Sequence, residues 1–220
     1  MLSALRDIGF ESAKANMVPF TVLWSFAGGI VYAYYRVGAA RRILDFLAVW
    51  QREGGAFAAF VSCGLFCGLI PYIVYRFRGA AGPRRPLATA LAQTVWTGTL
   101  GIACNRFFEL QAAWFGSGLD LVTLSLKTAV DQFVWTPLVI TPANTLFYFF
   151  VGKLGCRRVR HGELARSGTR FYASMLVMNW IVWIPAIFAV YALPQVLQIQ
   201  IVGLMSAVWA VLCREMGDRA

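Results

Sequence analysis

The residues whose types could do chemistry are Lys127, Asp131 and Gln132, which stand inside the apolar run from Trp114 to Phe150. That run is long and apolar enough to cross a bilayer, where ionisable side chains are costly and by default indicate a functional site. Lys127 and Asp131 are four residues apart, so on a helix they share one face and can form an ion pair. The pattern therefore indicates a buried charge that handles ions or polar solutes, or one that holds helices together.

The depth of Asp131 follows from helix geometry. A helix that begins near Leu121 carries Asp131 roughly 15 Å along its axis at ~1.5 Å per residue, which is near the middle of a ~30 Å hydrocarbon layer. Lys127 can extend its amine toward the interface, whereas the shorter Asp131 cannot. A buried pair can also fix helix register with no transport role. Two interpretations therefore remain: a conduit for solutes, and a bundle lock, meaning a buried polar contact that only holds the helices together.

Two segments of the chain share one pattern, Asp131-x-x-x-Trp135-x-Pro137 and Asn179-x-x-x-Trp183-x-Pro185. Proline-interrupted helices in corresponding positions are typical of transport sites in inverted repeats, although Trp and Pro are common in membrane helices. The candidate pore or gate residues are Lys127, Asp131, Gln132, Trp135, Pro137, Asn179, Trp183 and Pro185.

Composition sets the class of protein. The chain has 220 residues, of which 59% are hydrophobic and only 14% charged, and its mean hydropathy is +0.63. Soluble domains carry about 25% charged residues. We therefore expect an all-α integral membrane protein, a compact bundle of about six transmembrane or membrane-embedded helices in one domain over residues 1–220. Its partners would be membrane lipids and small solutes or ions.

The basic residues fit membrane topology better than nucleic-acid binding. The net charge is +10, but Lys and Arg are concentrated in short segments between apolar runs. Six crossings place both termini and most of these residues on one side, as the positive-inside rule favours. The expected spans are 18–35, 55–75, 87–105, one within 114–150, 171–193 and 196–213. Residues 1–17 form an interfacial segment, 36–53 lie on the membrane surface, and 151–170 form a basic loop.

That basic loop admits two interpretations. Its arginines can bind anionic lipid headgroups, or they can act only as topology determinants. The headgroup candidates are Arg157, Arg158, Arg160 and Arg166.

Other motifs indicate packing rather than catalysis. Gly64 and Gly68 form a GxxxG pair that permits close helix contact, and Gly28 with Gly29 leaves room for a neighbouring helix. The only histidine is His161, and the five cysteines form neither CxxC pairs nor a disulfide framework. This leaves no Ser/His/Asp arrangement and no zinc set, so we expect no enzyme, no metal and no cofactor.

The run Trp114, Asp120, Lys127, Asp131-Gln132 and Pro137 resembles the signature of the Mpv-seventeen/peroxisomal-membrane-protein-twenty-two family, in which K-x-x-x-D-Q is the specific element. Asn179-Trp180-x-x-Trp183-x-Pro185-x-x-Phe188 resembles its second signature. The family's Gly-Asp pair is absent after the first span, Ile187 stands near a usual glutamine, and 87–105 looks like extra chain. The resemblance implies a small protein of peroxisomal, organelle inner or bacterial membranes that acts as a channel or permeability regulator. It also implies pore or gate roles for Lys127, Asp131, Gln132 and Pro137.

Two functions from different classes therefore stay open. The first is a pore or transporter for small solutes, and the alternative is a non-conducting structural or lipid-organising protein. They differ in whether Asp131, Gln132, Asn179 and the threonines of 87–105 face one water-sized cavity. The sequence leaves open the solute, the membrane and any self-association.

Overall fold

The protein is all-helical wherever its structure is described. The computed structural model describes residues 17–77, 86–153 and 161–217, which are helical apart from short turns. The elements are α2 (Met17–Arg36), α3 (Gly38–Gly64), η1 (Leu65–Leu69), α4 (Ile70–Phe77), α5 (Pro86–Phe115), α6 (Leu121–Val130), η2 (Asp131–Ile140), α7 (Thr141–Lys153), α8 (His161–Tyr191) and α9 (Gln195–Gly217). The predicted all-α fold class is confirmed.

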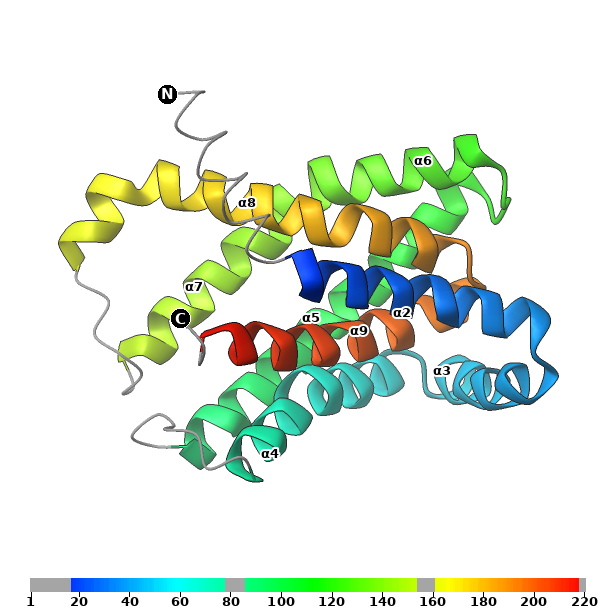
Figure 1. The fold of residues 1–220 in the computed structure, drawn as a ribbon, viewed down its shortest axis with the longest axis horizontal. Helices are drawn as coiled ribbons and strands as arrows, with labels where there is room; N and C mark the ends of the chain where they lie inside the picture. The colour runs from blue at the N-terminus through cyan, green and yellow to red at the C-terminus, as the bar shows by residue number, and fades with distance from the viewer. Residues whose placement is uncertain (1–16, 78–85, 154–160, 218–220) are drawn as a thin grey trace.

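These elements join into rods that run back and forth along one axis (Figure 1). The second half of α3 continues through η1 into α4, and α6 continues through η2 into α7. Helix α9 lies in the middle of the bundle and contacts α2, α3, α5 and α8. Residues 197–201 of α9 are all buried, as expected for a helix surrounded on every side.

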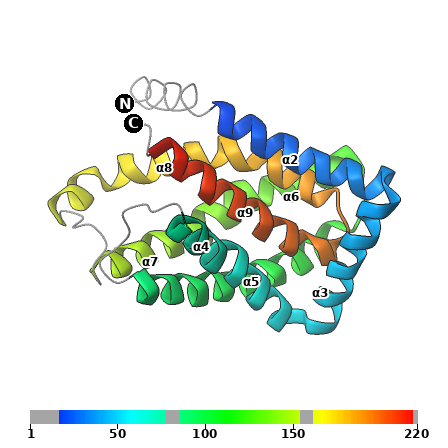
Figure 2. The same ribbon diagram turned by 60° about the horizontal axis from the view of Figure 1, so that its bottom comes forward.

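Helix α3 breaks at Gly55, whose backbone has φ 51° and ψ −123°, a conformation that favours glycine. Its first half lies across the end of the bundle, and its second half joins the bundle (Figures 1 and 2). The break falls where the sequence predicted the boundary between a surface segment and the second span. The first half exposes Ile43, Phe46 and Trp50.

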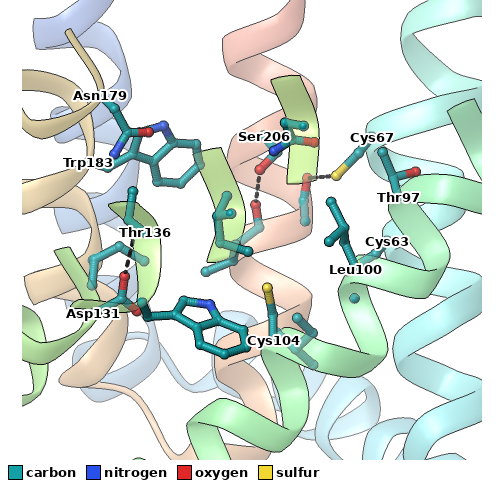
Figure 3. Close-up of a pocket in the computed structure, with 18 of the residues that line it drawn as sticks. Cys63, Cys67, Thr97, Leu100, Cys104, Asp131, Thr136, Asn179, Trp183 and Ser206 are labelled. Carbon is teal, nitrogen blue, oxygen red and sulfur yellow. Dashed lines mark hydrogen bonds between the residues drawn. The ribbon is translucent and has the colours of Figure 1, made fainter. Parts of the chain in front are cut away.

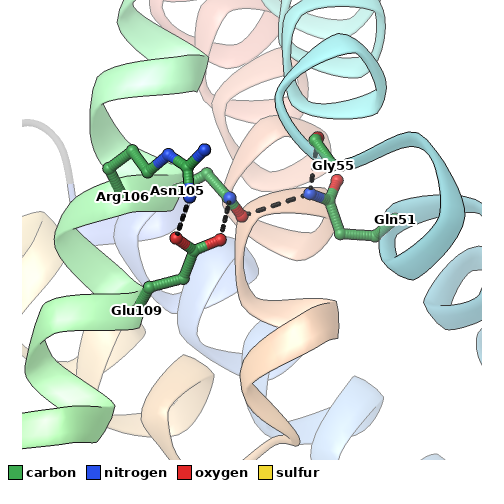
Figure 4. Close-up of polar contacts among 5 residues, drawn as sticks. All are labelled: Gln51, Gly55, Asn105, Arg106 and Glu109. Carbon is green, nitrogen blue, oxygen red and sulfur yellow. Dashed lines mark hydrogen bonds and ion pairs between the residues drawn. The ribbon is translucent and has the colours of Figure 1, made fainter.

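A polar network fastens this break to α5 (Figure 4). Gln51 Nε2 donates to Gly55 O at 2.9 Å and to Asn105 Oδ1 at 3.2 Å. Asn105 Nδ2 donates to Glu109 Oε1 at 2.8 Å, and Arg106 pairs with Glu109 at 2.7 Å. Arg106 and Glu109 form an ion pair on the helix surface, so these charges do not end the helix. Helix α5 continues to Phe115 rather than ending near residue 105 as predicted.

Small residues bring α3 and η1 close to α5. A Cβ added to Gly68 would lie 2.5 Å from Thr94 Cα, and one added to Gly64 would lie 3.0 Å from Thr94 O. The predicted packing role of this GxxxG pair is confirmed. The packing role expected for Gly28 and Gly29 is wrong within the described chain, since no described atom lies within 4 Å of a Cβ built at either one.

Gly68→Ala is expected to lower the unfolding temperature in detergent, whereas Gly29→Ala is expected to leave it unchanged or raise it slightly. Both changes gain up to about 1 kcal/mol of helix propensity. Only the change at Gly68 forces a methyl group into the Thr94 backbone, and such overpacking costs roughly 1–3 kcal/mol. Equal unfolding temperatures for the two variants would show that α5 and η1 do not pack as described.

The predicted basic loop is shorter than 151–170. Helix α7 extends to Lys153 and α8 begins at His161, so residues 161–170 are helical. Of the predicted interfacial segment 1–17, residues 1–16 lie outside the described residues, as do Arg157, Arg158 and Arg160. Arg166 falls in α8, but its side chain is not among those described.

Two described helical stretches are long and apolar enough to cross a membrane. They are Gly38–Val74 and Leu87–Phe115, and Asn179–Tyr191 and Gln195–Trp209 are shorter apolar helices. The predicted span 87–105 therefore belongs to one of the two stretches that pass this test.

Candidate functional site

The site begins with an unusual helix, since η2 is a ten-residue π-helix that contains Pro137. In a π-helix each N–H bonds five residues back, and proline has no N–H. The carbonyl five residues before Pro137 is that of Gln132, which is therefore free. It accepts a hydrogen bond from Trp180 Nε1 on α8 at 2.7 Å. Pro137 thus removes one backbone hydrogen bond of η2 at the point where α8 supplies another donor.

Two further bonds fix η2 against α8. Asn179 Nδ2 donates to Gln132 Oε1 at 3.2 Å, and the Tyr172 hydroxyl donates to Pro137 O. The two helices that carry the repeated sequence pattern are therefore joined along their length. Asn179 of one pattern thus bonds to Gln132, the residue that follows Asp131 in the other.

Asp131 is buried and accepts hydrogen bonds from three side chains. Tyr191 Oη donates to Asp131 Oδ2 at 2.8 Å, while Gln132 Nε2 and Thr136 Oγ1 lie 2.8 and 3.4 Å from Oδ1. The side chain is 4% exposed. Three donors around one carboxyl group suit an ionised carboxylate, which only accepts hydrogen bonds.

The predicted ion pair between Lys127 and Asp131 is wrong. Among the described residues, no carboxylate oxygen lies within 4.0 Å of Lys127 Nζ. The Tyr191 ring lies between the two groups, with Lys127 Nζ 5.7 Å from its centroid and its hydroxyl on Asp131. The spacing i, i+4 puts both residues on one side of the helix, but Tyr191 from α8 occupies Oδ2 of Asp131, and Gln132 and Thr136 of η2 itself occupy Oδ1.

A cavity of about 390 Å³ lies between η2, α8, α9, α3 and α5. Figure 3 shows Asp131, Thr136, Asn179 and Trp183 on one wall, facing Cys63, Cys67, Thr97 and Cys104 on the other. Gln93, Gln132, Trp135, Asn144 and Ser206 also line it. At about 30 Å³ per water, the volume corresponds to about a dozen waters. The arrangement can therefore hold a small polar solute beside a carboxylate and two amide side chains.

The candidate residues divide into two groups. Those that line this cavity are Asp131, Gln132, Trp135, Asn179 and Trp183, whereas Lys127, Pro137 and Pro185 do not. Corresponding positions of the two repeated patterns thus face one space, and the prolines shape the helices behind it. Trp135 also stacks on Phe107, with ring centroids 4.4 Å apart.

Tyr191 and Gln111 were not predicted as site residues from the sequence. Tyr191 is 2% exposed and joins Asp131 to Gln111, whose Nε2 lies 3.2 Å from the Tyr191 hydroxyl. Tyr191 also lines a second cavity of about 160 Å³ that contains Lys127. It therefore stands between the two cavities. A tyrosine at the end of an apolar helix gives no local signal, because its partners lie 60 and 80 residues away.

Asp120 positions α6, the helix that leads to the site. Its Oδ1 accepts a hydrogen bond from Thr123 N at 2.9 Å, so it is the N-cap residue. That bond to the backbone N–H holds the pKa of Asp120 below its usual value. A lowered pKa stabilises the fold at pH values above that of the unfolded carboxyl, and this contribution is lost as the pH falls through the folded value.

Asp120→Asn is therefore expected to keep the cap but to reduce the loss of stability on acidification. Asp120→Ala is expected to lower the unfolding temperature at neutral pH as well, since it removes the acceptor. Unfolding temperatures measured from neutral pH down through the carboxyl range would check both. An unaltered pH dependence in Asp120→Asn would contradict the assignment.

Comparison with known proteins returned no relative. No protein-family model, no curated protein and no solved structure matches the chain.

Proposed function

We propose that this chain is a membrane-embedded helical bundle that provides a pathway for small polar solutes or ions through the cavity beside Asp131. The observation that carries the proposal is that Asp131, Gln132 and Asn179 line one cavity of about 390 Å³ and that Thr97, alone among the threonines of 87–105, lines it with them. These residues come from η2, α8 and α5, and helices at a transport site contribute convergent polar groups in this way.

The placement of apolar side chains supports the membrane part of the proposal. Only 39% of the apolar window in Gly38–Val74 and 17% of that in Leu87–Phe115 is buried inside the protein, whereas a core helix of a soluble protein would be mostly buried. Large apolar side chains such as Leu91, Val95 and Leu138 face outward, while Gln111, Asp131 and Gln200 are buried. Lipid is the solvent that suits such an apolar exterior.

The native cysteines supply a direct test. Cys63, Cys67 and Cys104 line the cavity. A variant with serine at Cys156 and Cys213 keeps only these three of the chain's five cysteines. In liposomes we expect it to pass small solutes and to be blocked by a small mercurial, while a variant with all five replaced by serine should conduct and resist the reagent. Absence of flux in both variants, with folded protein present, would refute the proposal.

A bundle lock is the second candidate, and one observation favours it. Both oxygens of Asp131 are occupied by donors from the chain itself, which is what a structural carboxylate would show. In this case the lock joins Asp131 to Tyr191 rather than to Lys127. The protein would then be folded and inserted in the membrane without passing any solute.

A further inference from the structure

The smaller cavity contains a buried cation that has no anionic partner in the part of the chain that the structure describes. Lys127 is 2% exposed, and no described carboxylate lies within 4.0 Å of its ammonium. Gln111 Nε2 bonds to the Lys127 backbone carbonyl at 3.0 Å and so does not serve the ammonium. A buried charge without a partner is strongly disfavoured, which makes the space in front of this ammonium informative.

That space has the character of an anion site. It measures about 160 Å³, and its polar lining is Tyr35, Ser117, Lys127, Tyr191, Gln195 and Gln198. Among the described residues that line it, none is acidic, and Lys127 is the one charged side chain. Pro194 and Gln195 also line it, so the start of the 23-residue helix α9 faces it. The first amides of a helix have no intrahelical acceptor, and this end carries a partial positive charge.

We propose that this cavity binds one small monovalent anion, such as chloride or nitrate, with Lys127 as its counter-ion and the start of α9 as its second positive pole. The volume corresponds to about five waters, which suits a halide or nitrate with a partial hydration shell. Two poles of positive charge in one small space, whose described lining holds no carboxylate, favour a single negative charge. A bound anion also neutralises Lys127 and leaves Asp131, on the other side of Tyr191, as the one charged residue among the described residues that line the larger cavity.

This inference rests on the smaller cavity and not on conduction, so it is tested at equilibrium in detergent. Binding of radioactive chloride to the purified wild type, with gluconate keeping the ionic strength constant, is expected to saturate at one site per chain. Nitrate should compete for that site. Lys127→Met is expected to reduce binding more than tenfold, whereas Lys127→Arg should retain it. Arg42→Met removes an exposed cation from α3 and should bind as the wild type does.

A second variant keeps the test decisive if Lys127→Met does not fold. Ser117 is exposed in the turn before α6 and lines the cavity, so Ser117→Phe should fill the space with little effect on folding. We expect it to lose chloride binding. Absence of saturable chloride binding to the wild type would overturn the proposal, as would equal binding by folded Lys127→Met or Ser117→Phe.

Discussion

Asp131→Asn is expected to lower the preference of the reconstituted protein for cations over anions by about tenfold, which corresponds to about 1.4 kcal/mol. The change removes the one charge among the described residues that line the larger cavity, and it keeps a side chain of the same shape. A unit charge 4 Å away contributes about 4 kcal/mol at an effective dielectric constant of 20, so a tenfold change is a modest expectation. Reversal potentials in planar bilayers measure it.

The matched control is Asp45→Asn, which makes the same chemical change at an exposed carboxylate on α3. This variant should keep the wild-type ion preference. An Asp131→Asn protein that folds and conducts with unchanged selectivity would exclude Asp131 from the pathway.

The bundle-lock alternative predicts a different result at the same residue. Asp131→Leu leaves Tyr191, Gln132 and Thr136 without their acceptor, and each buried donor left unpaired costs roughly 1–3 kcal/mol. Tyr191→Phe in the same chain removes one of these donors and should recover part of the loss. Melting temperatures of the two single variants and the double variant give the coupling, which would be roughly 0.5–3 kcal/mol for a direct contact. A strong coupling with no current in any variant would favour the lock.

The helical framework was predictable because composition and apolar runs report it directly. The break at Gly55 coincides with the change from an arginine-rich amphipathic segment to a continuous apolar one. The close approach at Gly64 and Gly68 follows from small residues at i, i+4. Ends of helices were less predictable, since Arg106 and Glu109 look like a terminus in the sequence but form a surface pair within α5.

The residues of the candidate site were predictable from the sequence, but their hydrogen-bond partners were not. The cost of burying Asp131, Gln132 and Asn179 in an apolar run pointed to them, and all three line one cavity. The partner of Asp131 was wrongly assigned to Lys127, because spacing along one helix cannot reveal a donor on another. The π-helix at 131–140 was also missed, since its freed carbonyl at Gln132 becomes favourable only when Trp180 is placed beside it.

Tyr191 separates the two cavities, so its ring is expected to be the barrier of any continuous pathway between them. It lines the smaller cavity and holds Asp131, which lines the larger one. Tyr191→Leu removes the ring edge and the hydroxyl and should raise the flux of a small neutral solute severalfold. Tyr191→Phe keeps the ring, so its flux should stay near that of the wild type.

The two variants separate a barrier from a general loss of stability. Tyr191→Phe leaves Asp131 Oδ2 and Gln111 Nε2 without the hydroxyl, at a cost of roughly 1–3 kcal/mol, so it should also unfold at a lower temperature. If instability alone caused leakage, both variants would leak. Tyr32→Leu makes the same substitution at an exposed position of α2 and should alter neither property. Stopped-flow measurement of solute efflux from vesicles, together with melting temperatures, tests whether the ring is the barrier. A folded Tyr191→Leu protein with wild-type flux would show that it is not.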